Sequence, residues 1–189
     1  MTAHPTTIES ELQDRFGSAV LGAQPTRDGI PTIWVGADSI RTVLAFLKTG
    51  VSKPYPLLYD LFAIDERVRM DRALHPLSAN YTMVYHLLSF DRNEDVRVKV
   101  ALAGESPSVD SVTTVWPSAN WYEREAWDLF GIGFDGHPNL RRLLMPNTWV
   151  GHPLRKDQPA RATEIEPYQL HDAKLQTEQA AMQFQPEQW

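Results

Sequence analysis

The sequence predicts an α+β fold in which helices pack on one face of a mixed or antiparallel sheet, followed by an extended C-terminal arm. Residues 1–130 predict the folded part, because helical and alternating apolar patterns follow one another there. Asp28-Gly29 is a hairpin signal between two expected strands. Residues 131–165 predict the arm, because Pro and Gly interrupt every stretch long enough for a regular element.

Three helices are expected in the folded part. They cover residues 8–16, 38–49 and 121–130. Asp38 is the expected N-cap of the second helix, and Gly131 is the expected C′ residue of the third. The second helix is the clearest, because its apolar residues recur at i, i+3, i+4 and i+7, namely at Ile40, Val43, Leu44 and Leu47.

Five strands are expected between these helices. They cover residues 20–23, 30–36, 57–64, 81–90 and 96–102. The last strand alternates most cleanly, with Arg97 and Lys99 opposite a row of apolar residues formed by Val96, Val98, Val100 and Leu102. This alternation predicts a sheet with one face toward solvent.

Composition excludes several classes of protein. The chain has 189 residues and no cysteine, so disulfides, thiolate nucleophiles, thiolate zinc sites and Cys-ligated iron–sulfur clusters are excluded. Its net charge of −6 argues against a nucleic-acid partner. The sequence holds no apolar run long enough to span a bilayer and no secretory signal at its start, so a soluble cytoplasmic chain is expected.

The third expected helix carries aromatic residues on two faces and a cluster of acids. Glu123, Glu125 and Asp128 lie within one and a half turns, and Arg124 is placed to pair with Asp128 at i, i+4. A metal site would need a His at helical spacing, which this cluster lacks. These charges are therefore expected on a solvated or partner-facing surface.

The arm is apolar enough to cover a surface, its own or that of another subunit. It carries Leu140, Leu143, Leu144, Met145, Trp149, Val150 and Leu154, whereas a disordered linker is poor in such residues. Residues 141–161 hold five basic residues against one acid, which predicts an acidic docking surface. Residues 166–189 are expected to form a separate acidic, Gln-rich linker or tail.

Two motifs in the arm resemble functional sites, a dinucleotide-binding loop and a metal site, but the residues around them favour another interpretation. Residues 131–136 match G-x-G-x-x-G, but a helix precedes them and Pro138 follows, so a dinucleotide site is rejected. His137 and His152, with Asp135 and Asp157, could be drawn as the metal site of a hydrolase. The alternative is that each Gly-His-Pro is a turn in which His caps backbone groups and Arg pairs with acids.

The arm and the helix before it resemble one family closely. Glu-Arg-Glu at 123–125, Asp-Leu-Phe-Gly-Ile at 128–132, Phe-Asp-Gly-His-Pro-Asn-Leu-Arg-Arg-Leu-Leu at 134–144 and Gly-His-Pro-Leu-Arg-Lys-Asp at 151–157 are similar to the signature of the C (30 kDa) subunit of respiratory complex I, the proton-pumping NADH:quinone oxidoreductase. The tail resembles the linker of the bacterial form in which C and D are fused, so the chain resembles the C portion of a C/D fusion. Gln158 stands where relatives often carry an aromatic residue.

This resemblance implies a non-catalytic assembly subunit of the peripheral arm, on the cytoplasmic face of the bacterial inner membrane. It implies docking on the D (49 kDa) subunit, which helps form the quinone pocket, and contact with neighbouring iron–sulfur subunits. FMN and the iron–sulfur clusters are then expected on partners, with no cofactor, metal or catalytic residue on this chain and only indirect contact with the membrane. An equivalent subunit of a membrane-bound hydrogenase or formate-hydrogenlyase is the nearest alternative.

The resemblance also implies which residues act. Arg141, Arg142, Arg155 and Lys156 are expected to pair with acids on the partners, and Trp127, Phe130 and Trp149 are expected to be apolar anchors. The full set of signature and interface residues is Glu123, Arg124, Glu125, Trp127, Asp128, Phe130, His137, Arg141, Arg142, Trp149, His152, Arg155, Lys156 and Asp157.

Overall fold

The computed structural model describes residues 7–68 and 79–158. The expected tail at 166–189 lies outside the described residues. The elements run in the order α1 (Ile8–Phe16), β1 (Val20–Ala23), β2 (Thr32–Val35), α2 (Ile40–Thr49), β3 (Leu57–Asp65), β4 (Tyr81–Ser89), β5 (Glu94–Leu102), β6 (Ser108–Asp110), α3 (Ala119–Phe130) and β7 (Gly133–Asp135). Short 3₁₀ turns lie at Gly17–Ala19 and Ala37–Ser39.

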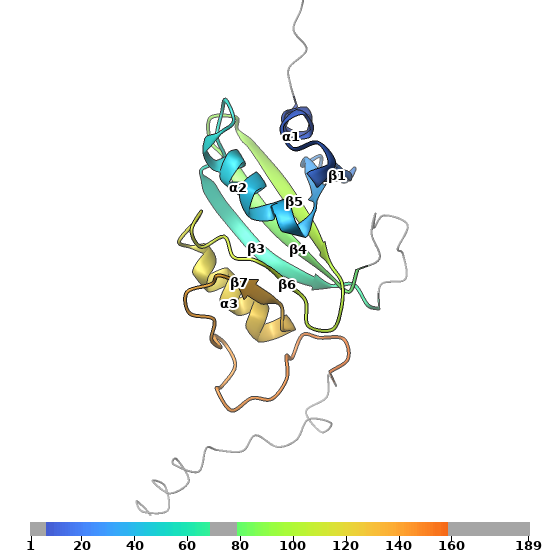
Figure 1. The fold of residues 1–189 in the computed structure, drawn as a ribbon, viewed down its shortest axis with the longest axis vertical. Coiled ribbons are helices and arrows are strands. Elements are labelled where there is room, and N and C mark those ends of the chain that lie inside the picture. Colours follow the sequence, from blue (N-terminus) through green and yellow to red (C-terminus); the bar gives the residue numbers. More distant parts are fainter. Residues whose placement is uncertain (1–6, 69–78, 159–189) are drawn as a thin grey trace, which may run out of the picture.

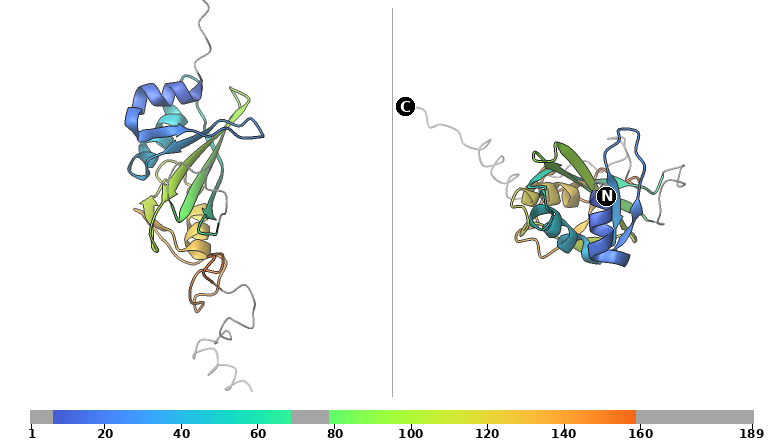
Figure 2. Two further views of the ribbon diagram at one scale, coloured as in Figure 1. Left: turned by 90° about the vertical axis from the view of Figure 1, so that its right-hand side faces the viewer. Right: turned by 90° about the horizontal axis from the view of Figure 1, so that it is seen from above.

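The main sheet is mixed, which confirms the predicted fold class. Its strand order is β1-β2-β5-β4-β3, with β2 and β5 parallel and every other pair antiparallel. Figure 1 shows α2 lying across this sheet and α3 at the opposite end from α1. Figure 2 shows α1 and α2 on the same side of the sheet.

One continuous core lies between the sheet and the helices. The expected stripe of α2, formed by Ile40, Val43, Leu44 and Leu47, is fully buried in the same core as the alternating apolar residues of β5. The core extends along α3 through Ala126 and reaches Ile132 and Phe134 beyond it. Because α3 also contacts β3, the predicted third helix is a structural part of the domain.

The opposite face of the sheet is less open to solvent than predicted. Thr82 and Val84 on that face of β4 are buried. Arg97 forms an ion pair with Asp28 at 2.7 Å, and Lys99 donates to Gln24 at 3.0 Å. The connection between β1 and β2 thus bonds to this part of the face, which the alternation within β5 could not show.

Several predicted boundaries are wrong, each for a local reason. Asp38 is not the N-cap of α2, because it lies inside a 3₁₀ turn and the helix begins at Ile40. β5 begins at Glu94, which pairs with Ser89 directly across the hairpin. The strands β6 and β7 were not predicted. They are three residues long, too short for any periodicity, and pair in parallel from Ser108 opposite Gly133.

The described part of the arm runs to Gln158 and folds back on the domain. Between β7 and Gln158 it contains turns and bends but no helix or strand, as the Pro and Gly pattern predicted. Figure 1 shows this segment, coloured orange, around the lower end of α3. Its contacts with α3 and with β3 form the candidate functional site.

Candidate functional site

Arg124 of α3 holds the start of the arm by its backbone. The residue is 7% exposed, and its guanidinium lies 5.1 Å from the ring centroid of Trp121. Its Nε donates to the carbonyl of Arg141 at 3.1 Å and its Nη2 to the carbonyl of Arg142 at 3.0 Å. The predicted Arg124–Asp128 pair is therefore wrong: the side chain reaches across to the arm instead of along the helix.

Asp128 collects four donors from the same stretch of the arm. Its side chain is fully buried, and Oδ2 accepts the backbone N–H groups of three successive residues, Leu143 (2.9 Å), Leu144 (2.8 Å) and Met145 (2.9 Å). Oδ1 accepts from Nη1 of Arg142 at 2.7 Å. Burial alone would raise the pKa of Asp128, but these donors outweigh it and hold the pKa below its ordinary value.

Arg142 joins that carboxylate to the middle of the arm. Its Nη2 donates to the carbonyls of Trp149 (2.9 Å) and Gly151 (3.0 Å), and its guanidinium lies 5.7 Å from the ring centroid of Trp127. All these contacts lie within the chain. A role for Arg142 in pairing with acids on a partner would require it to give them up.

His152 closes the arm against the C-terminal end of α3. Its Nδ1 donates to the backbone carbonyl of Asp128 at 3.0 Å, and its ring meets Trp127 edge-on at 6.0 Å between centroids. Gly131 has the left-handed backbone (φ +77°) that the sequence predicted at the helix end. A Cβ at Gly131 would lie 2.6 Å from Cδ2 of His152, so glycine is also needed for this approach.

The end of the arm is fastened to β3 by a second charge cluster. Asp65, with its side chain fully buried, accepts from Arg67 and from the backbone N–H of Lys156 at 2.9 Å. Asp157 accepts from Arg67 at 2.9 Å and from Arg155 at 3.1 Å, and Arg155 also reaches Glu105. Bonds from Arg155 and Arg67 hold the pKa of Asp157 well below its ordinary value.

Glu123 ties α3 to the segment that follows β6. It is fully buried and accepts from Oγ of Ser111 and from the N–H of Val112, both at 2.7 Å. Burial raises its pKa to about 7. The expectation of solvated acids on this helix is thus wrong for Glu123 and Asp128, since only Glu125 is exposed.

The two Gly-His-Pro segments form turns, as the structural alternative predicted. His137 accepts the N–H of Asn139 at Nδ1 (3.0 Å), and its Nε2 faces the carbonyl of Asn120 at 3.3 Å. Asp135 accepts from Ser108. Over residues 7–68 and 79–158, no three His, Asp or Glu side chains are grouped to hold a metal. The convergence that a metal-dependent hydrolase requires of His137, His152, Asp135 and Asp157 is absent from this part of the chain.

The remaining signature residues divide by exposure. Trp127, Phe130 and Trp149 are half-buried, and the first two pack against the domain's own core. Glu125, Arg141 and Lys156 are exposed. Sequence reasoning missed Asp65, Arg67, Glu105 and Ser111, because each meets its partner in the arm or in α3 only through the fold. A weak signal was Asp65 with Arg67 at the end of an apolar strand.

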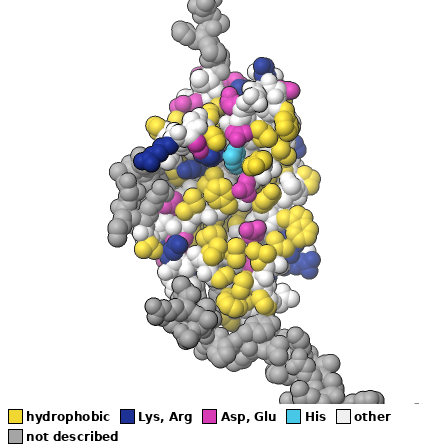
Figure 3. Space-filling view, turned by 180° about the vertical axis from the view of Figure 1, so that it is seen from behind, with side chains coloured by type: hydrophobic (Ala, Val, Ile, Leu, Met, Phe, Trp, Pro, Cys, Tyr) yellow, Lys and Arg dark blue, Asp and Glu magenta, His cyan; other side chains and the backbone are white. Residues whose placement is uncertain are grey.

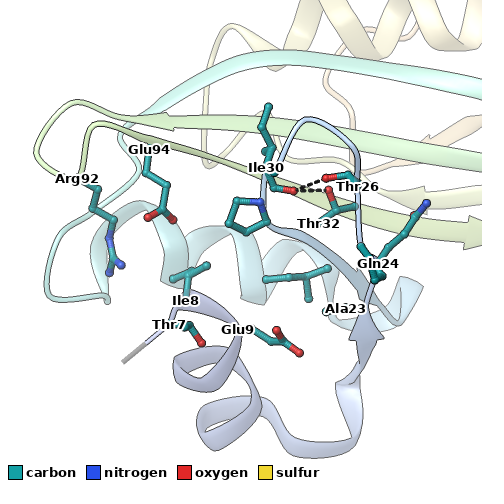
Figure 4. Close-up of a pocket in the computed structure, with 14 residues that line it drawn as sticks. Thr7, Ile8, Glu9, Ala23, Gln24, Thr26, Ile30, Thr32, Arg92 and Glu94 are labelled. Carbon is teal, nitrogen blue, oxygen red and sulfur yellow. Dashed lines mark hydrogen bonds between the residues drawn. The ribbon is translucent and has the colours of Figure 1, made fainter. Parts of the chain in front are cut away.

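A cavity in the described structure lies away from this site. Its volume is about 570 Å³, and it lies between the start of α1 and the β1–β2 connection (Figure 4). Two of the charged groups at its edge have partners, since Arg92 donates to Glu11 and Glu94 accepts from Tyr55. Thr26 and Thr32 both donate to the carbonyl of Ile30. These four side chains are therefore engaged within the chain.

No helix within the described ranges has the length and apolarity needed to cross a bilayer.

Polar side chains of the signature are concentrated at the junction of α3 and the arm. There, Arg124, Asp128, Arg142 and His152 all bind backbone groups of the same chain. This junction can therefore hold the arm in one position on the surface of the domain.

Comparisons with known proteins agree with the signature. Residues 33–164 match the family described as "Respiratory-chain NADH dehydrogenase, 30 Kd subunit". The chain is 55% identical over 188 residues to the NADH-quinone oxidoreductase C/D subunit of Methylococcus capsulatus, covering 100% of this chain and 32% of the relative. It is 54% identical to the C/D subunit of Pseudomonas fluorescens, covering 95% of this chain and 30% of the relative. The chain thus spans about a third of the length of these curated relatives.

Solved structures agree with the fold. The trypsin-resistant fragment (1-134) of Nqo5 has a TM-score of 0.59 at 27% identity, covering 70% of this chain and 98% of the fragment. A chain of an archaeal membrane-bound sulfane sulfur reductase shares the fold alone, with a TM-score of 0.54 at 20% identity over 95% of this chain and 94% of that one. The family match extends from β2 through the whole described arm, and the chain belongs to the 30 kDa subunit family of respiratory-chain NADH dehydrogenase.

Proposed function

We propose that this chain is a non-catalytic structural and assembly component of the peripheral arm of a proton-translocating NADH:quinone oxidoreductase. It docks on the D (49 kDa) region and adjoins the iron–sulfur subunits at the cytoplasmic face of the bacterial inner membrane. The flavin, the clusters and the quinone chemistry belong to those partners. The fused C/D names of the relatives at 53–55% identity support this over a hydrogenase subunit.

The main support for the proposal is the set of contacts that the signature residues make within the chain. Arg124, Asp128 and Arg142 bind backbone groups between residues 141 and 151, and Arg142 also pairs with Asp128. Groups engaged in this way are suited to positioning a segment rather than to transferring protons or electrons. An extended segment fixed in advance binds a partner with less loss of conformational freedom.

The test replaces Arg142 by Ala in a bacterium whose only copy of this chain is the variant. The expected result is a several-fold lower yield of assembled complex on native gels, because the middle of the arm loses its link to Asp128. NADH:quinone turnover per assembled complex should stay unchanged.

The matched control is Arg27→Ala, which removes an exposed arginine from the β1–β2 connection, outside the signature. It should assemble normally. Normal assembly of Arg142→Ala with a collapse in turnover per complex would show that the proposed structural role is wrong.

A further inference from the structure

The arm turns three large apolar side chains outward. Leu144 is 60% exposed, Val150 90% and Leu154 48%. Single exposed aliphatic residues are common on any surface, but three within eleven positions of one fixed segment form a group. We call Leu144, Val150 and Leu154 the outer ridge.

Hydrogen bonds to the backbone hold the outer ridge in place. The N–H of Leu144 is bound by Asp128, the carbonyls on either side of Val150 are bound by Arg142, and the N–H of Leu154 donates to the carbonyl of Leu129 at 3.0 Å. Leu144 and Leu154 are thus bonded directly to the C-terminal end of α3, and the backbone beside Val150 is linked to it through Arg142, which pairs with Asp128. The three side chains themselves are exposed.

Some of the basic residues near the outer ridge are paired with acids of this chain, and others are not. Arg142 and Arg155 are engaged within the chain, at Asp128 and at Asp157 and Glu105. Arg141 and Lys156 are exposed, and their side chains form no ion pair with any residue of the described ranges. A surface that accepts the ridge would be apolar at its centre and acidic at its rim.

The length of the relatives indicates what covers the ridge. They are single polypeptides named C/D, and this chain corresponds to 30–32% of their length. The outer ridge lies on the last described segment, at the end of the domain farthest from α1 (Figure 1). Figure 3 shows hydrophobic side chains continuing down the back of the molecule to this same end.

We propose that the outer ridge of Leu144, Val150 and Leu154 inserts as a preformed unit into an apolar, acid-rimmed groove on the D portion of the C/D polypeptide. Arg141 and Lys156 face the acids of that rim. This inference rests on the proposed function and specifies the contact surface. It assigns the contact to the exposed aliphatic residues rather than to Arg142, Arg155 or the half-buried Trp127.

The test measures binding of this 189-residue chain to the separately expressed D portion of the Methylococcus capsulatus C/D polypeptide. The C portion of that relative serves as the positive control for binding. The triple variant Leu144→Ser, Val150→Ser, Leu154→Ser should weaken binding by at least about thirtyfold, because central apolar anchors dominate interfaces. Its thermal unfolding and the amide exchange at residues 143–145 should match the unmodified chain.

The matched control is Phe90→Ser. Phe90 is 73% exposed and follows β4 at the opposite end of the domain, so this variant should bind the D portion normally. The double variant Arg141→Glu, Lys156→Glu should slow association, since rim charges act mainly on the association rate.

Four outcomes would overturn the inference. The triple variant could bind normally while the unmodified chain binds well, which leaves the proposed function standing. Tyr59→Ser with Phe62→Ser, on β3, could abolish binding instead. The triple variant could lose only self-association of the chain, which would make a second copy the occupant. If the relative's C portion binds and this chain does not, the proposed function fails as well.

Discussion

Two buried carboxylates of α3 show how surroundings determine the behaviour of one chemical group. Asp128 receives three backbone N–H groups and a guanidinium, and its pKa falls. Glu123 receives one hydroxyl and one N–H, with no ion pair to any described residue, and burial raises its pKa to about 7. Asp128 is therefore ionised at neutral pH, whereas Glu123 titrates there.

Glu123→Gln is expected to remove a pH dependence of stability. The ordinary pKa of a glutamate is 4.5, so between that pH and about 7 the folded chain binds more protons than the unfolded chain. The unfolding free energy therefore falls as pH rises through this window, by on the order of 3 kcal/mol. Urea unfolding between pH 5 and 8.5 should show this fall in the unmodified chain and a flatter profile in Glu123→Gln.

Glu125→Gln is the control for that experiment, because Glu125 is exposed on the same helix. It should keep the pH profile of the unmodified chain. Parallel profiles for the unmodified chain and Glu123→Gln would contradict the assignment of this titration to Glu123.

At the scale of elements, the C-terminal end of α3 is the point where helix and arm become one unit. The helix ends at Gly131, whose N–H donates to the carbonyl of Trp127 at 2.8 Å. The chain then reverses through β7, which pairs with β6. His152 and Leu154 return to the carbonyls of Asp128 and Leu129. Two of the last carbonyls of the helix are thus bonded by the arm.

Gly131→Ala should be more damaging than Gly136→Ala. Both glycines have positive φ, so each alanine costs roughly 1–2 kcal/mol in backbone strain. Only at Gly131 does the added Cβ meet His152, whereas the position beside Gly136 is open. The difference in unfolding free energy between the variants, measured in urea, should be about 1 kcal/mol or more.

Adding His152→Ala tests the cause of that difference. The double variant Gly131→Ala, His152→Ala should be less destabilised than the sum of its single variants, because the steric contact is gone. Simple additivity would show that His152 does not limit the residue at 131.

At the scale of the whole molecule, the arm is fastened to the domain at two separate places. Asp128 holds residues 142–145, and Asp65 holds Lys156 together with Arg67. Both carboxylates are fully buried, and both have pKa values below the ordinary value despite burial. The segment between them, including the outer ridge, is thereby held at its two ends.

Asp128→Asn and Asp65→Asn should release different parts of the arm. Removing the charge of Asp128 leaves Arg142 without its carboxylate, so the unfolding free energy should fall by roughly 2–4 kcal/mol. Amide hydrogen exchange should quicken at residues 143–145 in Asp128→Asn and at Lys156 in Asp65→Asn. Loss of protection at both ends in either variant would show that the arm is held as one cooperative unit.

Much of the fold was predictable because its causes are local. The burial of α2, the hairpins and the end of α3 at Gly131 follow from periodicity and turn chemistry within a few residues. The Gly-His-Pro turns were also recognised, because His137 caps the N–H of Asn139 two residues along. Family membership was readable from the signature, and the comparisons confirm it.

The sequence by itself determined the class of fold, the position of the arm and the residues that mark the family. Only the tertiary structure decided what those residues do. Asp128 meets donors 14 to 17 positions away, and Asp65 meets the N–H of Lys156 91 positions away. Local patterns cannot select such partners, because packing of the sheet and α3 brings them together. That packing turned the acids and arginines inward and left Leu144, Val150 and Leu154 outside.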